Sequence, residues 1–132
     1  MILKGRKIYQ GIAAGEALVT CEGISFFGGV DPDTGLIVDQ QHELNGQSIA
    51  GKVLVFPKGK GSTVGSYTLY RLKQNGLAPL SIVNAACETI VAVGCIIAEI
   101  PCIDQIDIGN IKNGEWVMMD GAKAIVEVKD RS

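Results

Sequence analysis

Short apolar runs separated by glycine clusters recur along the chain, and this pattern predicts strands joined by tight turns. Residues 13–19 (Ala-Ala-Gly-Glu-Ala-Leu-Val) and residues 51–56 (Gly-Lys-Val-Leu-Val-Phe) predict the first two strands. Four consecutive apolar residues make the second strand the more buried one. It ends at Pro57, which has no N–H to donate to a sheet.

A glycine-rich loop at residues 59–63 and a helix at residues 64–74 are expected after the second strand. Asn75-Gly76 then supplies a typical helix stop. Positions at about helical spacing give this helix an apolar stripe, which consists of Val64, Tyr67, Leu69 or Tyr70, and Leu72.

The next segment continues the alternation of strand and helix. A strand at residues 79–84 is followed by an apolar segment, residues 88–99, that is long enough for a buried helix. A further short strand is expected at residues 98–103. These elements complete a β-α-β-α unit.

The C-terminal part predicts a hairpin. After a turn-rich loop at residues 104–114, residues 115–120 and 124–128 form two apolar runs around Asp120-Gly121, a pair that favours tight turns. The mixture of β and β-α units predicts a single three-layer or barrel-like α/β domain over residues 1–132, with no internal boundary.

The composition limits the classes of partner. Hydrophobic residues make up 47% of the chain and charged residues 20%, which is typical of a packed domain. Aromatic residues are only 5%, so stacking platforms for nucleic-acid bases are scarce, and a net charge of −2 gives little attraction for DNA or an anionic membrane. Charges interrupt the N-terminal apolar run, and no stretch is apolar enough to span a bilayer. We therefore expect a cytoplasmic protein with no nucleic-acid or membrane partner.

The four cysteines do not have the spacing of a metal site. They contain no C-x-x-C pair, and the chain has a single histidine, His42, so neither zinc nor ferredoxin patterns fit. We expect no metal ligands and interpret the cysteines as buried structural thiols: Cys21, Cys87, Cys95 and Cys102.

The richest chemistry lies in residues 58–63, Lys-Gly-Lys-Gly-Ser-Thr. A glycine-rich turn between a buried strand and a helix directs backbone N–H groups at an anion such as a phosphate or a carboxylate. Because Gly61 separates Lys60 from Ser62, the sequence is not a Walker A loop, and it is not a G-x-S-x-G hydrolase elbow either. Ser62 or Thr63 is suited to capping the helix, a role compatible with catalysis, although the helix dipole alone seldom makes serine a strong base.

Other polar residues have weaker cases. Gly28-Gly29 would let the backbone approach a ligand closely, while Asp31 and Asp33 are typical of a turn. His42 is expected to be exposed or hydrogen-bonded rather than catalytic. Lys60 is suited to binding phosphate as a point charge, and equally to being solvated.

Four segments in combination resemble the aconitase X swivel-domain family over nearly the whole chain: residues 15–19, 24–35, 51–67 and 84–94. The resemblance implies a single-domain α/β fold of the swivelling β/β/α type, like the mobile aconitase domain that closes over a substrate held against a [4Fe–4S] cluster. It also implies that the cluster resides on a large partner subunit, so that this chain binds no cofactor itself.

The same resemblance implies an activity. Archaeal members dehydrate (R)-5-phosphomevalonate to trans-anhydromevalonate 5-phosphate as two-subunit hydro-lyases of the mevalonate pathway, and the serine that matches Ser62 is their proton acceptor. From position we expect Lys60, Gly61 and Thr63, together with Gly28 and Gly29, to contact the phosphorylated hydroxy acid. Two alternatives stay open, a related dehydratase of the 3-hydroxyproline type and a non-catalytic anion-binding module.

Overall fold

The computed structural model describes residues 1–129, and the last three residues of the expected domain lie outside that range. Eight strands form one sheet in the order β1-β8-β7-β3-β4-β5-β6-β2. The strands are β1 (Ile2–Lys4), β2 (Arg6–Tyr9), β3 (Ile12–Val19), β4 (Val53–Phe56), β5 (Ser81–Asn84), β6 (Cys102–Asp104), β7 (Trp116–Asp120) and β8 (Ile125–Lys129). The helices are α1 (Phe26–Gly29), α2 (Gly65–Gln74), α3 (Thr89–Ala98) and the 3-10 turn η1 (Ile108–Asn110).

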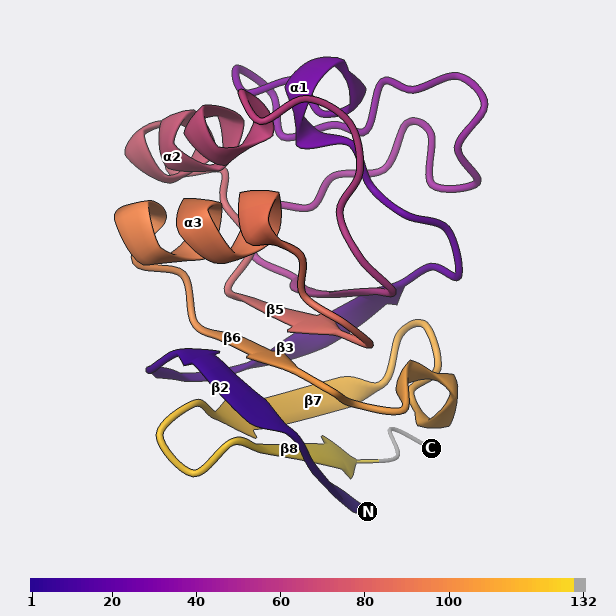
Figure 1. Ribbon diagram of the computed structural model, residues 1–132. Coiled ribbons are helices and arrows are strands. Elements are labelled where there is room, and N and C mark those ends of the chain that lie inside the picture. Colours follow the sequence, from indigo (N-terminus) through magenta and orange to yellow (C-terminus); the bar gives the residue numbers. More distant parts are fainter. Residues whose placement is uncertain (130–132) are drawn as a thin grey trace.

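Strand β3 divides this sheet into two layers. Its first part, from Ile12 to Glu16, pairs antiparallel with β7, whereas its second part, from Ala17 to Val19, pairs parallel with β4. Residues on β4 alternate between two cores: Val53 packs into the cluster between the sheet layers, and Leu54 packs into the cluster beneath the helices. The result is two β layers covered by α2 and α3 (Figure 1), which confirms the predicted β/β/α fold.

The N-terminal strands β1 and β2 were not expected from the sequence. They lie at opposite ends of the strand order, where β1 pairs with β8 and β2 with β6, yet only Gly5 separates them along the chain. The two edges of the sheet are therefore brought together at Gly5. A side chain there would overlap the carbonyl oxygen of Asp104, so glycine is required at this corner.

Helix α2 begins one residue later than expected, and its buried face differs from the predicted stripe. Leu69 and Leu72 are fully buried as expected, but Val64, Tyr67 and Tyr70 are exposed. Small residues take the inner positions because α2 and α3 approach closely: the buried face also contains Gly65, Ser66 and Thr68.

Helix α3 is only half buried, which corrects the expected buried helix. Its N-cap is Glu88, whose side chain accepts hydrogen bonds from the N–H groups of Ile90 and Val91. The inner face contains Val91, Gly94, Cys95 and Ala98, whereas Val93, Ile96 and Ile97 face outward. No helix within residues 1–129 is long and apolar enough to cross a membrane.

The remaining strands agree with the predicted runs apart from their bounds. Strand β5 begins at Ser81 rather than residue 79, and β6 extends to Asp104 while Ala98 still belongs to α3. Strands β7 and β8 form the predicted hairpin. Its turn is stabilised by the Asp120 carboxylate, which accepts hydrogen bonds from the N–H groups of Ala122 and Lys123.

Candidate functional site

The glycine loop, residues 57–64, connects β4 to α2 and lies beside the segment that follows β3. The N–H of Ile24 donates to the carbonyl oxygen of Lys58 at 3.2 Å, and the N–H of Lys60 donates back to the carbonyl of Ile24 at 3.0 Å. These two bonds bring together the two glycine motifs that the sequence analysis treated separately.

Glycines allow the loop to pack this closely. Gly61 has a φ of +91°, and a Cβ there would lie inside 3.0 Å of the Ser25 hydroxyl oxygen. A Cβ on Gly59 would lie 2.5 Å from both a Glu88 carboxylate oxygen and a Val91 methyl group. The loop is thus held between the segment before α1 and the N-terminus of α3.

Ser62 lies at the exposed end of this loop. Its hydroxyl oxygen accepts a hydrogen bond from the N–H of Val64 at 3.2 Å, and its carbonyl oxygen accepts one from Gly65 at 2.9 Å. The N-cap residue of α2 is Val64, which makes no side-chain cap. Ser62 therefore closes the turn before the helix, which corrects the expectation that Ser62 or Thr63 is the N-cap.

Three successive backbone N–H groups of the loop, those of Gly61, Ser62 and Thr63, donate to no other group within residues 1–129. We refer to them as the free amides. They precede α2, whose N-terminus adds a partial positive charge, and Lys60 is exposed beside them. Free consecutive N–H groups are the donors that anion-binding turns use.

Gly28 and Gly29 lie in α1, on the other side of the loop. Gly28 has a φ of +83° and open space around its Cβ position. The connection to the loop runs through two neighbours, since Ser25 faces Gly61 and the backbone nitrogen of Phe27 lies 3.5 Å from the Cβ position of Gly65. The Ser25 hydroxyl donates to the carbonyl oxygen of Phe27 at 3.0 Å, which fixes its direction.

Asp31 and His42 have structural roles, as predicted. The Asp31 carboxylate accepts a hydrogen bond from the N–H of Asp33 at 2.9 Å within a turn. The buried His42 ring accepts from the N–H of Leu44 at Nδ1, so its Nε2 donates to the carbonyl oxygen of Gly23 at 3.2 Å. With both ring nitrogens engaged inside the domain, His42 has no free nitrogen to accept a substrate proton.

The cysteines divide into an interior group and an exposed one. Cys95 and Cys102 are buried and Cys87 is half-buried, whereas Cys21 is exposed, so the prediction of a buried thiol is wrong for Cys21. A hydrogen bond with Cys102, together with burial, raises the pKa of Cys87 well above its usual value. Within residues 1–129, no group of three or more His, Cys, Asp or Glu side chains is placed to hold a metal ion.

An ion pair between the half-exposed Arg6 and the buried Asp104 supports the turn on which α3 begins, and it could not be identified from the sequence. The Asp104 carboxylate accepts two hydrogen bonds from the Arg6 guanidinium, at 2.8 and 2.9 Å, and a third from the N–H of Cys87 at 2.8 Å. The carboxylate is 1% exposed, and the bonds to it favour the charged form of Arg6, whose pKa is raised. The partners lie 98 residues apart in the chain, so no local pattern indicates the pair.

Comparison with known proteins gives consistent matches over nearly the whole chain. A family model described as the aconitase X swivel domain matches residues 2–128. The chain is 54% identical over 130 residues to the phosphomevalonate dehydratase small subunit of Thermococcus onnurineus, covering 98% of this chain and 100% of that protein. It is 52% identical over 129 residues to the protein of the same name from Methanosarcina acetivorans, covering 96% of this chain and 90% of that protein.

The fold has an equally similar solved counterpart. The crystal structure of Thermococcus kodakaraensis aconitase X in its holo-form superposes with a TM-score of 0.97 and 51% sequence identity. The match covers 98% of this chain and 99% of that chain. Sequence and structure comparisons therefore agree on one family.

Proposed function

Because this chain belongs to the aconitase X swivel-domain family, we propose that it is the small subunit of a hydro-lyase that dehydrates (R)-5-phosphomevalonate to trans-anhydromevalonate 5-phosphate. Relatives at 54% and 52% identity are named as small subunits of this dehydratase, and that name implies a large partner subunit. The chain is active only in that complex. Its product feeds the mevalonate route to isoprenes, and we place the reaction in the cytoplasm.

The observation that carries the site assignment is the position of Ser62 among the free amides. Dehydration removes a proton from C2 of the substrate, next to the carboxylate, and releases the hydroxyl group from C3 as the double bond forms. A proton acceptor must therefore lie beside a group that binds the carboxylate. The Ser62 hydroxyl and the free amides at residues 61–63 provide these two functions on one turn.

Formation of the Ser62 alkoxide requires help from its surroundings. The N–H of Val64 donates to its oxygen, and the N-terminus of α2 adds a favourable dipole, so both stabilise the alkoxide form. Closure against the large subunit excludes water from this exposed loop, which strengthens these interactions. Ser62 then accepts the C2 proton and returns it to solvent when the site opens.

The substrate contacts follow from the same geometry. We assign the carboxylate to the amides of Gly61 and Thr63 and the phosphate to Lys60, an exposed residue that directly precedes these amides in the chain. Gly28 lines the approach from the α1 side, where its open Cβ position leaves room for a ligand. Gly29 is buried behind it and supports the turn rather than touching the substrate. Specificity for a phosphorylated hydroxy acid thus comes from two anion contacts close to Ser62.

The [4Fe–4S] cluster that the family implies does not fit this chain, because the described residues 1–129 contain no suitable group of ligands. We therefore assign the cluster to the large subunit. When bound there, it would supply the Lewis acid for the departing hydroxyl group. The contribution of this chain is the proton acceptor, the anion contacts and the exclusion of water.

A second function is supported by the free amides themselves, since three such N–H groups bind an anion without any chemistry. Under that hypothesis the chain is a non-catalytic anion-binding module. A third hypothesis keeps the hydro-lyase but changes the substrate to a 3-hydroxyproline-type acid.

The test is anaerobic co-expression of this chain with its large subunit, followed by mass spectrometry of candidate substrates incubated with the purified, cluster-loaded complex. We expect loss of one water molecule from (R)-5-phosphomevalonate and none from 3-hydroxyproline. Dehydration of hydroxyproline alone would contradict the proposed substrate. Dehydration of neither acid by an intact complex would contradict the lyase assignment and favour the anion-binding module.

A further inference from the structure

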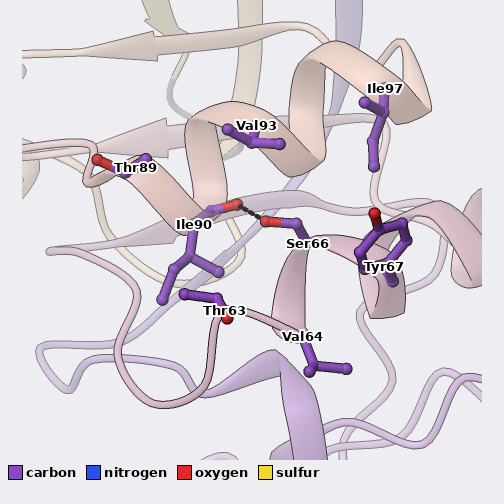
Figure 2. A pocket seen from close by; sticks show the side chains of 8 residues that line it. All are labelled: Thr63, Val64, Ser66, Tyr67, Thr89, Ile90, Val93 and Ile97. Carbon is purple, nitrogen blue, oxygen red and sulfur yellow. Dashed lines mark hydrogen bonds between the residues drawn. The ribbon is translucent and has the colours of Figure 1, made fainter.

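An apolar groove runs between the outer faces of α2 and α3. Its volume is about 410 Å³, and its lining includes Thr63, Val64, Tyr67, Ile90, Val93 and Ile97. Figure 2 shows Tyr67 on α2 pointing toward Ile97 on α3, with Val93 farther along α3 and Val64 at the start of α2. The Ser66 hydroxyl donates to the carbonyl oxygen of Ile90 at 2.6 Å, so these two polar groups satisfy each other and leave the lining apolar.

Four apolar side chains of this groove are exposed to solvent. Tyr67 is 66% exposed, Val64 47%, Val93 42% and Ile97 39%. Contiguous apolar surface on a folded domain marks a site of interaction with another molecule. Neither helix gains internal packing from these residues, because the opposite faces of α2 and α3 already cover the core.

The position of the groove identifies its occupant. Thr63 and Val64 follow Ser62 directly, so the groove begins where the glycine loop ends. On the other side of the loop, Phe27 is 46% exposed. Exposed apolar groups therefore flank Ser62 on both sides, and we propose that the apolar groove is a docking site for an apolar segment of the large subunit.

This inference rests on the proposed function, because it requires a partner that holds the substrate. A substrate on the large subunit must come within hydrogen-bonding distance of Ser62 for proton transfer. The large subunit then has to cover the end of the domain that carries Ser62. The apolar groove is continuous with that end, because Thr63 and Val64 belong to its lining. A second copy of this chain in the groove would instead lie across the residues beside Ser62 and obstruct the substrate.

The test measures association rather than turnover. Val93→Glu and Val93→Lys place a charge of either sign in the groove, and the dissociation constant for the large subunit is measured anaerobically by titration calorimetry. The matched controls are Ile12→Glu and Ile12→Lys. Ile12 is 76% exposed and is the first residue of β3, whereas the glycine loop lies beside the segment that follows the last residue of β3. Circular dichroism checks that each variant is folded, and Ile97→Lys repeats the test in the last turn of α3.

We expect both Val93 variants to weaken association by about 30-fold or more, because a charge is then buried in an apolar interface. The Ile12 variants should change it by less than about threefold. Binding of the Val93 and Ile97 variants at wild-type strength would overturn the docking site. So would self-association of the isolated chain that the Val93 substitutions abolish while binding to the large subunit persists.

The two proposals fail separately in this design. Because calorimetry requires no reaction, a complex that depends on Val93 but dehydrates no phosphomevalonate would support the docking site and refute the proposed function. A complex that dehydrates phosphomevalonate and tolerates both charges at Val93 would do the reverse.

Discussion

The close contact between Gly61 and Ser25 determines how firmly the glycine loop holds Ser62, and Gly61→Ala perturbs it directly. At a φ of +91°, alanine costs about 1–2 kcal/mol relative to glycine. The new methyl group would also overlap the Ser25 hydroxyl, which lies inside 3.0 Å of the Cβ position. Ser25 must rotate away and give up its hydrogen bond to Phe27, which is worth about 1 kcal/mol. We therefore expect Gly61→Ala to destabilise the domain by about 2–3 kcal/mol.

Two further variants separate the free-energy cost of the left-handed backbone from the cost of the overlap with the Ser25 hydroxyl. Gly46 has a φ of +85° and nothing within 4 Å of its Cβ position, so Gly46→Ala should cost only the backbone penalty of about 1–2 kcal/mol. Ser25→Ala removes the overlapping oxygen. In that background Gly61→Ala should cost about 1 kcal/mol less than in the wild type.

Urea unfolding of the isolated chain measures the free energy of unfolding of the wild type, the three single variants and the Ser25→Ala/Gly61→Ala double variant. The dehydration rate of the complex reports the position of Ser62. A displaced loop should lower the rate about tenfold or more, since small misplacements of catalytic groups are costly. The reasoning is refuted if Gly61→Ala destabilises no more than Gly46→Ala and Ser25→Ala brings no relief.

Three further predictions concern other parts of the domain. The hydrogen bond from Thr20 lowers the pKa of Glu43 below its ordinary value of 4.5, so the folded state binds fewer protons and stability should fall as the pH drops through and below about 4.5. Urea midpoints between pH 6 and 3 should show a smaller fall in Glu43→Gln. Alkylation of the folded protein with iodoacetamide at pH 8 should label Cys21, which is exposed, and spare Cys87, because its raised pKa keeps it a thiol. Peptide mass mapping identifies the labelled residues, and equal labelling of the two cysteines would contradict the partial burial of Cys87. Gly94→Ala should destabilise by about 1–3 kcal/mol despite the better helix propensity of alanine, because its Cβ would lie 2.5 Å from a Leu69 methyl group; a gain in urea midpoint would contradict this.

Local signals in the sequence were sufficient for the central elements. Strand β4 is a run of four buried apolar residues that ends at Pro57, and the glycine loop and the helix stop at Asn75-Gly76 are equally local. Ser62 was identified by resemblance to a family, and the structure adds the turn and the free amides around it. The backbone directions that create these amides depend on Gly61, whose contact with Ser25 cannot be read from spacing.

Long-range pairing explains what the sequence did not indicate. Strands β1 and β2 are short and charged, and they form because β8 and β6 lie beside them in the fold. The faces of α2 and α3 were misjudged for a related reason: apolar residues lie on more than one side of both helices, and composition does not say which side is covered. The exposed set, which includes Tyr67 and Val93, is the one that we assign to the partner.

Ser62 is the proton acceptor in the proposed reaction, and this role is measured by single-turnover dehydration of (R)-5-phosphomevalonate by the assembled complex. The rates with wild-type chain and with Ser62→Ala are compared in complexes shown by sedimentation to be equally assembled and by iron analysis to be equally loaded. Loss of a general base should slow the reaction by about 10²–10⁴-fold without weakening assembly. A Ser62→Ala complex that dehydrates the substrate within about threefold of the wild-type rate, a difference of about 0.6 kcal/mol in the barrier, would contradict the account.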